Sequence, residues 1–258
     1  MATFRELVEF TRPTIVACMR IALSYVSPAV RCGYLPDRLW RLRYEIADEL
    51  TPAEYEKRME QGWRRFGHAL FTTDCPACRK CQSLRVDVKA FQPNRSQRRA
   101  EKANRDLAVT FGPPQLDEDR LKLYDRFHAA RAIDVGWKVR EPESAASYYE
   151  SFIDNPFVTQ EWCYWLGERL VAVGYVDHLP QSLSAIYFFS DPDLRGRSLG
   201  TFNVLSVIRS AREQALPHVY LGYYVEGCRS LEYKANFGPH ERLVNGVWMG
   251  DKDIVMEA

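Results

Sequence analysis

The sequence predicts an α+β fold in which helices and strands follow one another irregularly along the chain. After Pro156, short alternating or apolar runs are separated by turn residues, which indicates strands. Stretches with helical spacing and capping residues lie before and between these runs. The composition agrees, because 258 residues with 46% hydrophobic and 27% charged side chains are typical of a folded globular protein and exclude global disorder.

The chain is expected to begin with an extension and a small domain. Residues 1–31 form the extension, to which the sequence assigns no role; a helix beginning at Glu6–Phe10 would be interrupted by Pro13. Residues 32–112 are expected to form a small α/β domain that carries a cysteine cluster and a basic helix.

Two regular elements are predicted early in this small domain. Thr51 and Glu54 form a capping box with Pro52 at the first helical position, and they predict a helix over 52–62. Residues 83–88 alternate between polar and apolar side chains, so they are predicted to form a strand.

Residues 94–107 are predicted to form a helix with one strongly basic face. From Arg79 to Arg105 there are nine basic residues against Asp87 and Glu101, although the net charge of the whole chain is only +1. Such a helix can follow an RNA backbone through phosphate contacts; the alternative is an ordinary solvated face. The candidate RNA-binding side chains are Arg95, Arg98, Arg99, Lys102 and Arg105.

Cysteine is the unusual residue type, with seven copies of which three crowd into seven positions. An odd number cannot be a closed set of intramolecular disulfides, so a metal or redox site in a reducing compartment is the better interpretation. Cys75, Cys78 and Cys81 have the C-x2-C-x2-C spacing that lets thiolates converge on zinc or an iron–sulfur cluster. Cys32 is the first choice for a fourth ligand and His68 the second; three reduced thiols without metal are the alternative.

The hydropathy pattern does not favour a membrane protein. No uninterrupted apolar run reaches the roughly 18 residues that a membrane span needs. The best stretch, from Thr14 to Val30, is broken by Arg20 and Pro28 and lacks a clear small-residue cleavage site. We therefore expect a soluble, cytoplasmic protein.

A turn at residues 112–114 (Gly-Pro-Pro) marks the predicted boundary to a second domain over 113–258. Residues 117–155 are predicted to be mostly helical. A break is expected near Gly136, followed by a second helix over 144–153.

The rest of the second domain is predicted to mix strands and helices. A hairpin that turns at Gly167 is predicted, with its two strands over 158–166 and 170–176. The elements that follow are an apolar strand over 185–189, a polar loop over 190–200, a helix over 201–215, a strand over 219–224, a helix over 227–236 and a last strand over 247–249.

This order of hairpin, buried strand, loop, helix and strand resembles the core of acetyltransferase-like (GNAT) folds. In those enzymes an R-x-x-G-x-G/A loop binds the diphosphate of coenzyme A at the helix N-terminus. Arg197 and Gly200 match the first half of that motif, but Phe202 stands where a small residue should let the diphosphate approach. The resemblance therefore implies a GNAT-like acyltransferase domain with a different acyl donor.

Several motifs stand in order along the chain. They are Cys32-Gly-Tyr-Leu-Pro36-Asp-Arg38, Gly62-Trp-Arg-Arg-Phe-Gly67, the cysteine run 75–81, Leu84-Arg-Val-Asp-Val88, Asn94-Arg-Ser-Gln-Arg-Arg99, Phe188-Phe-Ser-Asp-Pro-Asp193, Arg197-Ser-Leu-Gly200 and Tyr220–Pro239. Together they resemble the aminoacyl-tRNA–protein transferase family, whose members attach arginine or leucine to proteins with exposed N-terminal Asp or Glu. The resemblance covers about residues 32–250. Leu35 stands where the eukaryotic, arginine-transferring pattern has a second cysteine, so leucine is the favoured donor.

The resemblance implies that a protein α-amine attacks the ester of a charged tRNA, a reaction that needs alignment and proton removal but no added cofactor. Glu226 is the best candidate for a general base or an amine-binding group. Arg197, Arg229 and Lys234 are candidates for pairing the acidic first residue of the acceptor, and the last two are also catalytic candidates. The remaining candidates are Tyr223 and Tyr233 at the catalytic centre, and Ser198 and Tyr224 for substrate binding. Core packing is the alternative for the tyrosines.

The expected partners are aminoacyl-tRNA and proteins that begin with Asp or Glu, which the transfer would mark for degradation; no membrane partner is expected. Three other functions stay open. One is arginyl transfer to the same acceptors, and another is coenzyme A-dependent N-acetylation, against which Phe202 argues. The third is a metal-stapled RNA-binding protein without catalysis.

Overall fold

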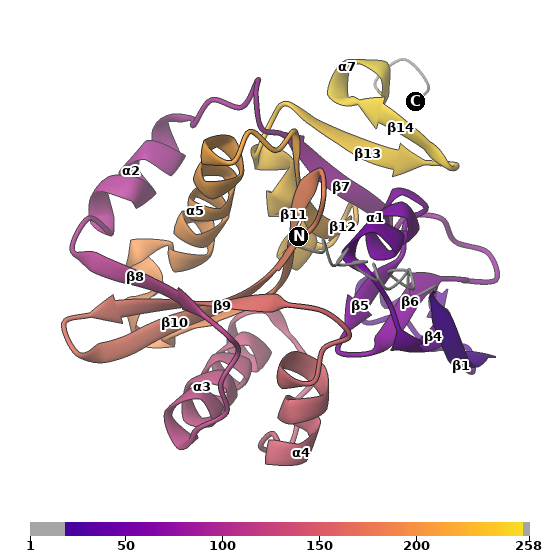
Figure 1. Cartoon of the computed structure of the whole chain (residues 1–258), viewed down its shortest axis with the longest axis horizontal. Coiled ribbons are helices and arrows are strands. Elements are labelled where there is room, and N and C mark those ends of the chain that lie inside the picture. Colours follow the sequence, from indigo (N-terminus) through magenta and orange to yellow (C-terminus); the bar gives the residue numbers. More distant parts are fainter. Residues whose placement is uncertain (1–18, 255–258) are drawn as a thin grey trace, which may run out of the picture.

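The computed structural model describes residues 19–254, and its main feature is an eight-stranded sheet (Figure 1). Neighbouring strands are antiparallel except for one parallel pair, β11 and β12, at the centre. With the helices on its faces, the sheet confirms the predicted α+β class. In spatial order its strands are β14 (Val247–Gly250), β13 (His240–Val244), β7 (Gln82–Asp87), β12 (His218–Tyr224), β11 (Ser182–Ser190), β10 (Arg169–His178), β9 (Thr159–Leu166) and β8 (Leu107–Gly112).

Helices cover both faces of this sheet (Figure 1). One face carries α2 (Arg95–Ala103) and α5 (Leu199–Glu213), and the other carries α3 (Glu118–Val135) and α4 (Ala145–Tyr148). Strand β9 is therefore buried on both sides, with Tyr164 in the core under α5 and Cys163 in the core under α3. None of the helices within residues 19–254 combines the length and the apolar character that a membrane crossing requires.

A four-stranded sheet forms the N-terminal part of the described chain (Figure 1). Its strands, in spatial order, are β1 (Arg20–Val26), β4 (Leu42–Glu49), β6 (Ala69–Thr73) and β5 (Arg64–Phe66), and a separate ribbon is formed by β2 (Val30–Arg31) and β3 (Leu39–Trp40). Helix α1 (Pro52–Glu60) begins with the predicted capping box. The Glu54 N–H donates to Thr51 Oγ1 at 3.3 Å, and the Thr51 N–H donates to Glu54 Oε2 at 3.0 Å.

Part of the predicted N-terminal extension belongs to this smaller sheet. Strands β1 and β2 fall within residues 20–31, and β1 pairs with β4 so that Tyr25 lies opposite Tyr44. The expected helix at Glu6–Phe10 and its interruption at Pro13 lie outside the described residues.

The predicted elements of the second half are present with shifted ends. The hairpin of β9 and β10 turns at Gly167, which has φ +60° and so adopts the left-handed conformation that glycine favours. The helix predicted over 227–236 is divided into a short α-helix and a 3-10 turn. The remaining helical segments are the π-turn η1 (Tyr149–Ile153), the 3-10 turns η2 (Pro192–Arg197) and η3 (Tyr233–Asn236), and the helices α6 (Arg229–Glu232) and α7 (Asp251–Ile254).

The two sheets are joined within one packed body. Strand β7 lies between β12 and β13, and β8 pairs with β9, so residues 82–112 contribute two strands to the larger sheet. The smaller sheet shares a core with the larger one, because Tyr55 and Met59 of α1 pack in the same cluster as Leu179 and Tyr220. The boundary predicted at residue 112 therefore does not separate the two sheets, because residues 82–112 already belong to the larger one.

Candidate active site

A fork between β11 and β12 opens a cavity at the centre of the larger sheet. The two parallel strands pair only over residues 182–184 and 218–220. Beyond these residues they share no further pairs, so a gap is left between them. The next residues along the two strands, Ala185 and Leu221, line a cavity of about 530 Å³.

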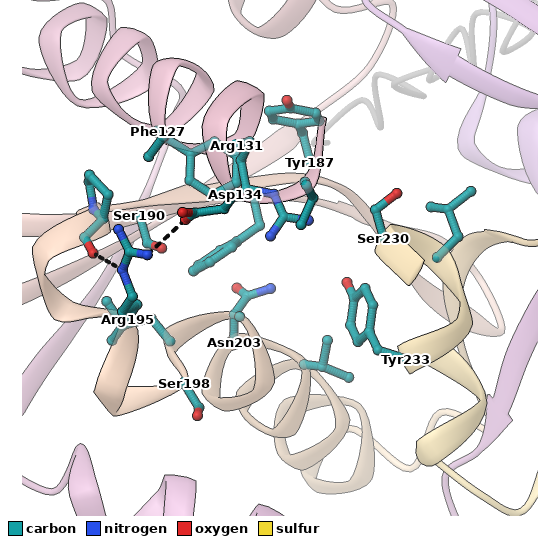
Figure 2. Close-up of a pocket in the computed structure, with 18 of the residues that line it drawn as sticks. Phe127, Arg131, Asp134, Tyr187, Ser190, Arg195, Ser198, Asn203, Ser230 and Tyr233 are labelled. Atoms are coloured by element: carbon teal, nitrogen blue, oxygen red, sulfur yellow. Dashed lines mark hydrogen bonds and ion pairs between the residues drawn. The ribbon is translucent and has the colours of Figure 1, made fainter. Parts of the chain in front are cut away.

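The walls of this cavity come from α3, β11, the first turns of α5, and the segment of α6 and η3 (Figure 2). An apolar pocket with a few convergent polar groups is typical of a substrate site. The apolar side chains in its lining include Phe127, Ala185, Ile186, Phe188, Leu199, Val204, Leu221 and Leu231.

Both carboxylates in the lining are ion-paired. Asp134 lies 2.9 Å from Nη1 of Arg195. Asp191 is buried and is paired with Arg126 at 3.0 Å and also with Arg169. Among the described residues that line it, the cavity therefore presents no unpaired carboxylate.

Cations dominate the polar part of the lining. Arg131 of α3 stacks over Trp137 at 5.1 Å, and its Nε is buried with no hydrogen-bond partner among residues 19–254. Arg131 lies near Tyr187 and Tyr233 (Figure 2), and its positive charge opposes the rise that burial causes in the pKa of both phenols. Arg229 adds a further positive charge, so the cavity is suited to anionic or carbonyl-bearing ligands.

Asn203 points into the cavity from α5 (Figure 2). Its Oδ1 accepts a hydrogen bond from the Tyr164 hydroxyl at 2.8 Å, which fixes the orientation of the amide. Gly174 allows this approach, because a Cβ there would lie 2.7 Å from the same oxygen. The Nδ2 group is therefore left to donate to a ligand. Asn203 is not among the site residues predicted from the sequence; the signal that could have indicated it is an amide side chain within the mostly apolar run 202–208.

Lys234 lines the cavity from η3 and is half-buried. Its Nζ donates to the backbone oxygen of Tyr223 at 2.9 Å. Burial, followed by the positive charge of nearby Arg64, lowers the pKa of Lys234 to about 7. An anion bound beside this amine would favour its charged form.

Known proteins related in sequence cover nearly the whole described chain. Residues 30–99 match the N-terminal part, and residues 119–244 the C-terminal part, of the arginine-tRNA-protein transferase family. The aspartate/glutamate leucyltransferase of Campylobacter jejuni is 33% identical over 229 residues, which cover 88% of this chain and 95% of that protein. The chain belongs to the arginine-tRNA-protein transferase family. The aspartate/glutamate leucyltransferase of Vibrio cholerae is 36% identical over 236 residues, covering 90% of this chain and 97% of that protein.

Membership of this family makes the chain an aminoacyl-tRNA–protein transferase. Among solved structures, similarity is found to the C-terminal domain of an Agrobacterium fabrum protein assigned as a lysylphosphatidylglycerol synthetase. That alignment has a TM-score of 0.45 and 14% identity, and it covers 69% of this chain and 63% of that chain.

Four of the predicted site residues of this transferase meet at the cavity. Arg229, Tyr233, Lys234 and Ser198 all contribute to its lining. Ser198 precedes α5 with a left-handed backbone (φ 54°), and its side chain makes no capping hydrogen bond. The first N–H groups of α5 therefore have no side-chain partner from Ser198 and can serve a ligand.

Glu226 lies outside the cavity lining, contrary to the expectation that it acts on the reacting amine. Its side chain is exposed and binds Nζ of Lys80 at 2.9 Å. This hydrogen bond lowers the pKa of the Glu226 carboxyl, which makes it a weaker base. Neither its position nor its ionisation supports the predicted role of general base.

Two predicted tyrosines also lie outside the lining and have structural contacts. Tyr223 is buried, and its hydroxyl donates to the backbone oxygen of Gly62 at 2.9 Å. The guanidinium of Arg242 lies 4.6 Å from the ring centre of Tyr224. Both side chains thus follow the packing alternative rather than the substrate-facing one.

Phe202 does not have the effect that its position in the motif suggested. Its side chain is buried in the core and packs against Tyr164 with ring centres 5.8 Å apart. It therefore points away from the start of α5 and does not cover it. The family relationship, rather than a steric block by Phe202, argues against a coenzyme A enzyme.

The predicted basic face is present on α2. Gln97 and Ala100 are buried toward the sheet, and Glu101, the one acidic residue of the helix, is paired with Arg209 of α5 at 2.8 Å. The helix ends at Ala103, so Arg105 lies in the turn before β8. The exposed basic side chains are Arg95, Arg98, Arg99, Lys102 and Arg105.

Arg197 connects this basic helix to the entrance of α5 instead of lining the cavity. Its Nη1 donates to the backbone oxygen of Ala103 at 3.1 Å and to Asp106 at 2.7 Å. In return, Nδ2 of Asn104 donates to the Arg197 backbone oxygen at 2.7 Å. The end of α2 is thereby held next to Ser198, which lines the cavity.

The four predicted metal ligands gather in one region. The pKa of the Cys81 thiol is raised to about 12, first by burial and then by surrounding thiols, which are Cys75, Cys32, Cys78 and Cys228. Within residues 19–254, no three His, Cys, Asp or Glu side chains are arranged to hold a metal ion. Zinc or iron–sulfur binding therefore stays a prediction, which elemental analysis of the purified protein would test.

The contacts of Cys32 and His68 distinguish the two choices for a fourth ligand. The Cys32 sulfur accepts hydrogen bonds from the backbone N–H groups of Tyr34 and Leu35, each at 3.4 Å, and Cys32 is one of the thiols that surround Cys81. His68 is engaged elsewhere, because its Nδ1 lies 2.6 Å from the backbone oxygen of Ala47. Of the two, Cys32 is the better suited ligand.

Proposed function

We propose that this transferase moves leucine from leucyl-tRNA to the α-amine of proteins that begin with Asp or Glu, and so marks them for degradation. The observation that carries the proposal is the forked cavity, with its apolar walls, its unpaired cations and no unpaired carboxylate among the described residues of its lining. Relatives named aspartate/glutamate leucyltransferase support the same choice of donor and acceptor. The reaction needs charged tRNA, so we place it in the cytoplasm.

The charges of the cavity favour leucine over arginine as the transferred residue. An arginyl side chain in a pocket needs a carboxylate partner, because a buried guanidinium without one is costly. The two carboxylates available, Asp134 and Asp191, are already bound to arginines. A leucyl side chain needs only apolar contacts, and residues such as Ile186, Leu199 and Leu221 supply them.

The basic face of α2 is the proposed docking surface for the tRNA. Exposed arginine and lysine side chains bind phosphates without reading the base sequence. The contacts of Arg197 with Ala103 and Asp106 hold the end of α2 next to the cavity. A tRNA whose backbone follows α2 could therefore place its aminoacylated 3′ end at the start of α5.

The proposed chemistry needs little beyond alignment. The acceptor α-amine attacks the ester carbonyl carbon, a C–N bond forms, the C–O bond to the ribose breaks, and the proton lost by the amine reaches the departing 3′ oxygen through water. An α-amine with a pKa of about 8 is about one-tenth neutral at pH 7, so no strong base is required. Nδ2 of Asn203 is placed to donate to the carbonyl oxygen as it gains negative charge.

We also infer that the larger sheet and its helices form a GNAT-like acyltransferase domain, preceded by the cysteine-bearing part of the chain. The succession of the β9–β10 hairpin, β11, α5 and β12 supports this assignment, as does the fork between the parallel pair. In such a domain the acyl donor lies at the start of the helix that follows the central strand, which here is α5.

A transfer assay tests the proposal. The purified protein is mixed with tRNA carrying radiolabelled leucine or arginine, and with peptides that begin with Asp, Glu or Ala. We expect label from leucine on the Asp and Glu peptides only. Label from arginine alone, label on the Ala peptide at an equal rate, or no label with fully charged tRNA would each contradict it.

A further inference from the structure

Arg64 is buried at the fork between β11 and β12 without a carboxylate partner among the described residues. Its side chain reaches from β5 of the smaller sheet, and its Nη2 donates to the backbone oxygen of Ala185 at 3.0 Å. The residue is only 6% exposed. Ala185 is the first residue of β11 beyond its pairs with β12, and it lines the cavity. Arg64 therefore sits directly behind the cavity wall.

The neighbouring arginine shows how the same strand buries a guanidinium when its role is structural. Arg65 is fully buried against Asp177, with Nε donating to Oδ2 at 3.0 Å, and it also donates to Thr159 and Asn155. Within residues 19–254, the partners of Arg64 are a backbone oxygen and, at 3.9 Å, the sulfur of Met59. A buried charge without an anion is costly, so Arg64 is poised to receive one.

Lys234 and Arg64 approach the same small space, which lies over Gly222. A Cβ built on Gly222 would be 3.4 Å from Nζ of Lys234, 3.7 Å from Nη2 of Arg64 and 3.8 Å from its Nε. Gly222 has φ +85° at an irregularity in the pairing of β12 with β7, and it leaves this space open. Because both cations lie within 4 Å of that Cβ position, they are close enough to each other for a single carboxylate to accept hydrogen bonds from both.

We propose that Arg64 and Lys234 bind the side-chain carboxylate of the acceptor's first residue and so select Asp and Glu. This inference rests on the proposed function, since it names the groups that read the acceptor. Lys234 belongs to the cavity lining, and Arg64 reinforces it from behind. The acceptor carboxylate at the fork leaves its α-amine free to face the ester held near Asn203 and the start of α5.

The proposal explains selection against the amide counterparts of Asp and Glu. An Asn or Gln side chain has nearly the same shape but no charge, so it would leave both cations without an anion. The alternative is that Arg64 only holds the backbone oxygen of Ala185 and stabilises the fork. If Arg64 binds the acceptor carboxylate, its replacement reduces the preference for Asp over Asn. If it only stabilises the fork, its replacement leaves that preference unchanged.

The test compares kcat/KM for peptides that begin with Asp, Glu, Asn and Gln, using wild type, Arg64→Gln and Arg64→Lys. We expect Arg64→Gln to lower transfer to the Asp and Glu peptides by about 10- to 100-fold, the loss of one charged hydrogen-bonded contact, while transfer to Asn and Gln peptides changes little. Arg64→Lys should retain part of the preference. The matched control is Arg20→Gln on β1; the Arg20 side chain is exposed and lies outside the cavity lining, so this change should leave all rates unchanged.

The outcomes separate this inference from the function on which it rests. A wild-type protein that transfers to none of the peptides contradicts the proposed function. A folded Arg64→Gln protein that keeps the wild-type ratio of Asp to Asn transfer overturns only the role of Arg64. If Arg64→Gln does not fold, the test uses Lys234→Gln instead. We then expect the preference for Asp over Asn to be lost. A Lys234→Gln protein that keeps the wild-type ratio of Asp to Asn transfer overturns the carboxylate site.

Discussion

In the proposed reaction, Asn203 is a group whose orientation is fixed by one buried contact. The Tyr164 hydroxyl occupies its oxygen, so the amide cannot flip without losing that hydrogen bond. Its nitrogen is thereby kept as a donor at the cavity. A donor that is already oriented costs no reorganisation when charge develops on the ester oxygen.

We expect Asn203→Ala to lower kcat for leucyl transfer by about 100-fold, the usual effect of removing one such donor, with a smaller change in KM. Single-turnover measurements with saturating leucyl-tRNA would show the loss. Ser210→Ala, on the same helix and outside the cavity lining, is the control. An unchanged kcat in a folded Asn203→Ala protein would exclude this role.

At the level of single elements, helix α2 has a packed inner side and a basic outer side. Its inner side packs through Gln97 and Ala100, and a capping box of Asn94 and Gln97 fixes its start. Its outer side is basic, and its one carboxylate, that of Glu101, is bound to Arg209. The positive charge of the outer side is therefore available to a polyanion.

We expect the triple change Arg98→Ala, Arg99→Ala and Lys102→Ala to weaken tRNA binding without changing kcat at saturating tRNA. Each lost phosphate contact should reduce the slope of log affinity against log salt concentration by about one. Binding measured at several salt concentrations gives that slope. A control with Arg20, Lys57 and Lys122 changed to Ala removes the same charge from other exposed positions. An equal loss in both proteins would mean that only net charge matters.

Elements that carry a capping or turn motif in their own residues could be predicted from the sequence. The capping box of α1 and the turn at Gly167 are visible in the sequence because they depend on neighbouring residues alone. Strand β5 has no such signal, since Arg-Arg-Phe is neither alternating nor apolar. Both arginines of β5 are buried through contacts with distant residues. Arg65 is paired with Asp177 of β10, and Arg64 donates to the backbone oxygen of Ala185 at the fork.

At the scale of the whole molecule, the ion pair of Arg65 and Asp177 joins the two sheets. Arg65 belongs to β5 of the smaller sheet and Asp177 to β10 of the larger one, and both side chains are fully buried. Arg64, the residue before Arg65 on β5, reaches the fork and donates to the backbone oxygen of Ala185. The position of Arg64 at the fork therefore depends on how the two sheets pack against each other.

We expect Asp177→Ala to lower the free energy of unfolding by about 3–5 kcal/mol, because it leaves the Arg65 charge buried without a partner. Urea unfolding followed by circular dichroism measures the change. Asp193→Ala removes an exposed carboxylate as the control, and its effect should stay within about 1 kcal/mol. A similarly small effect for Asp177→Ala would show that the pair does not hold the sheets together.

The α+β class, most elements of the second half, the basic face of α2 and the family resemblance could all be predicted from the sequence, because caps, turns, periodicity and motifs are local properties of the chain. The sequence also placed Lys234, Arg229, Tyr233 and Ser198 at the site. Three positions became known only from the three-dimensional structure: Glu226 faces solvent, Asn203 lines the cavity, and Arg64 lies behind the cavity wall. Burial and ion pairing depend on which distant residues become neighbours, and no local pattern carries that information.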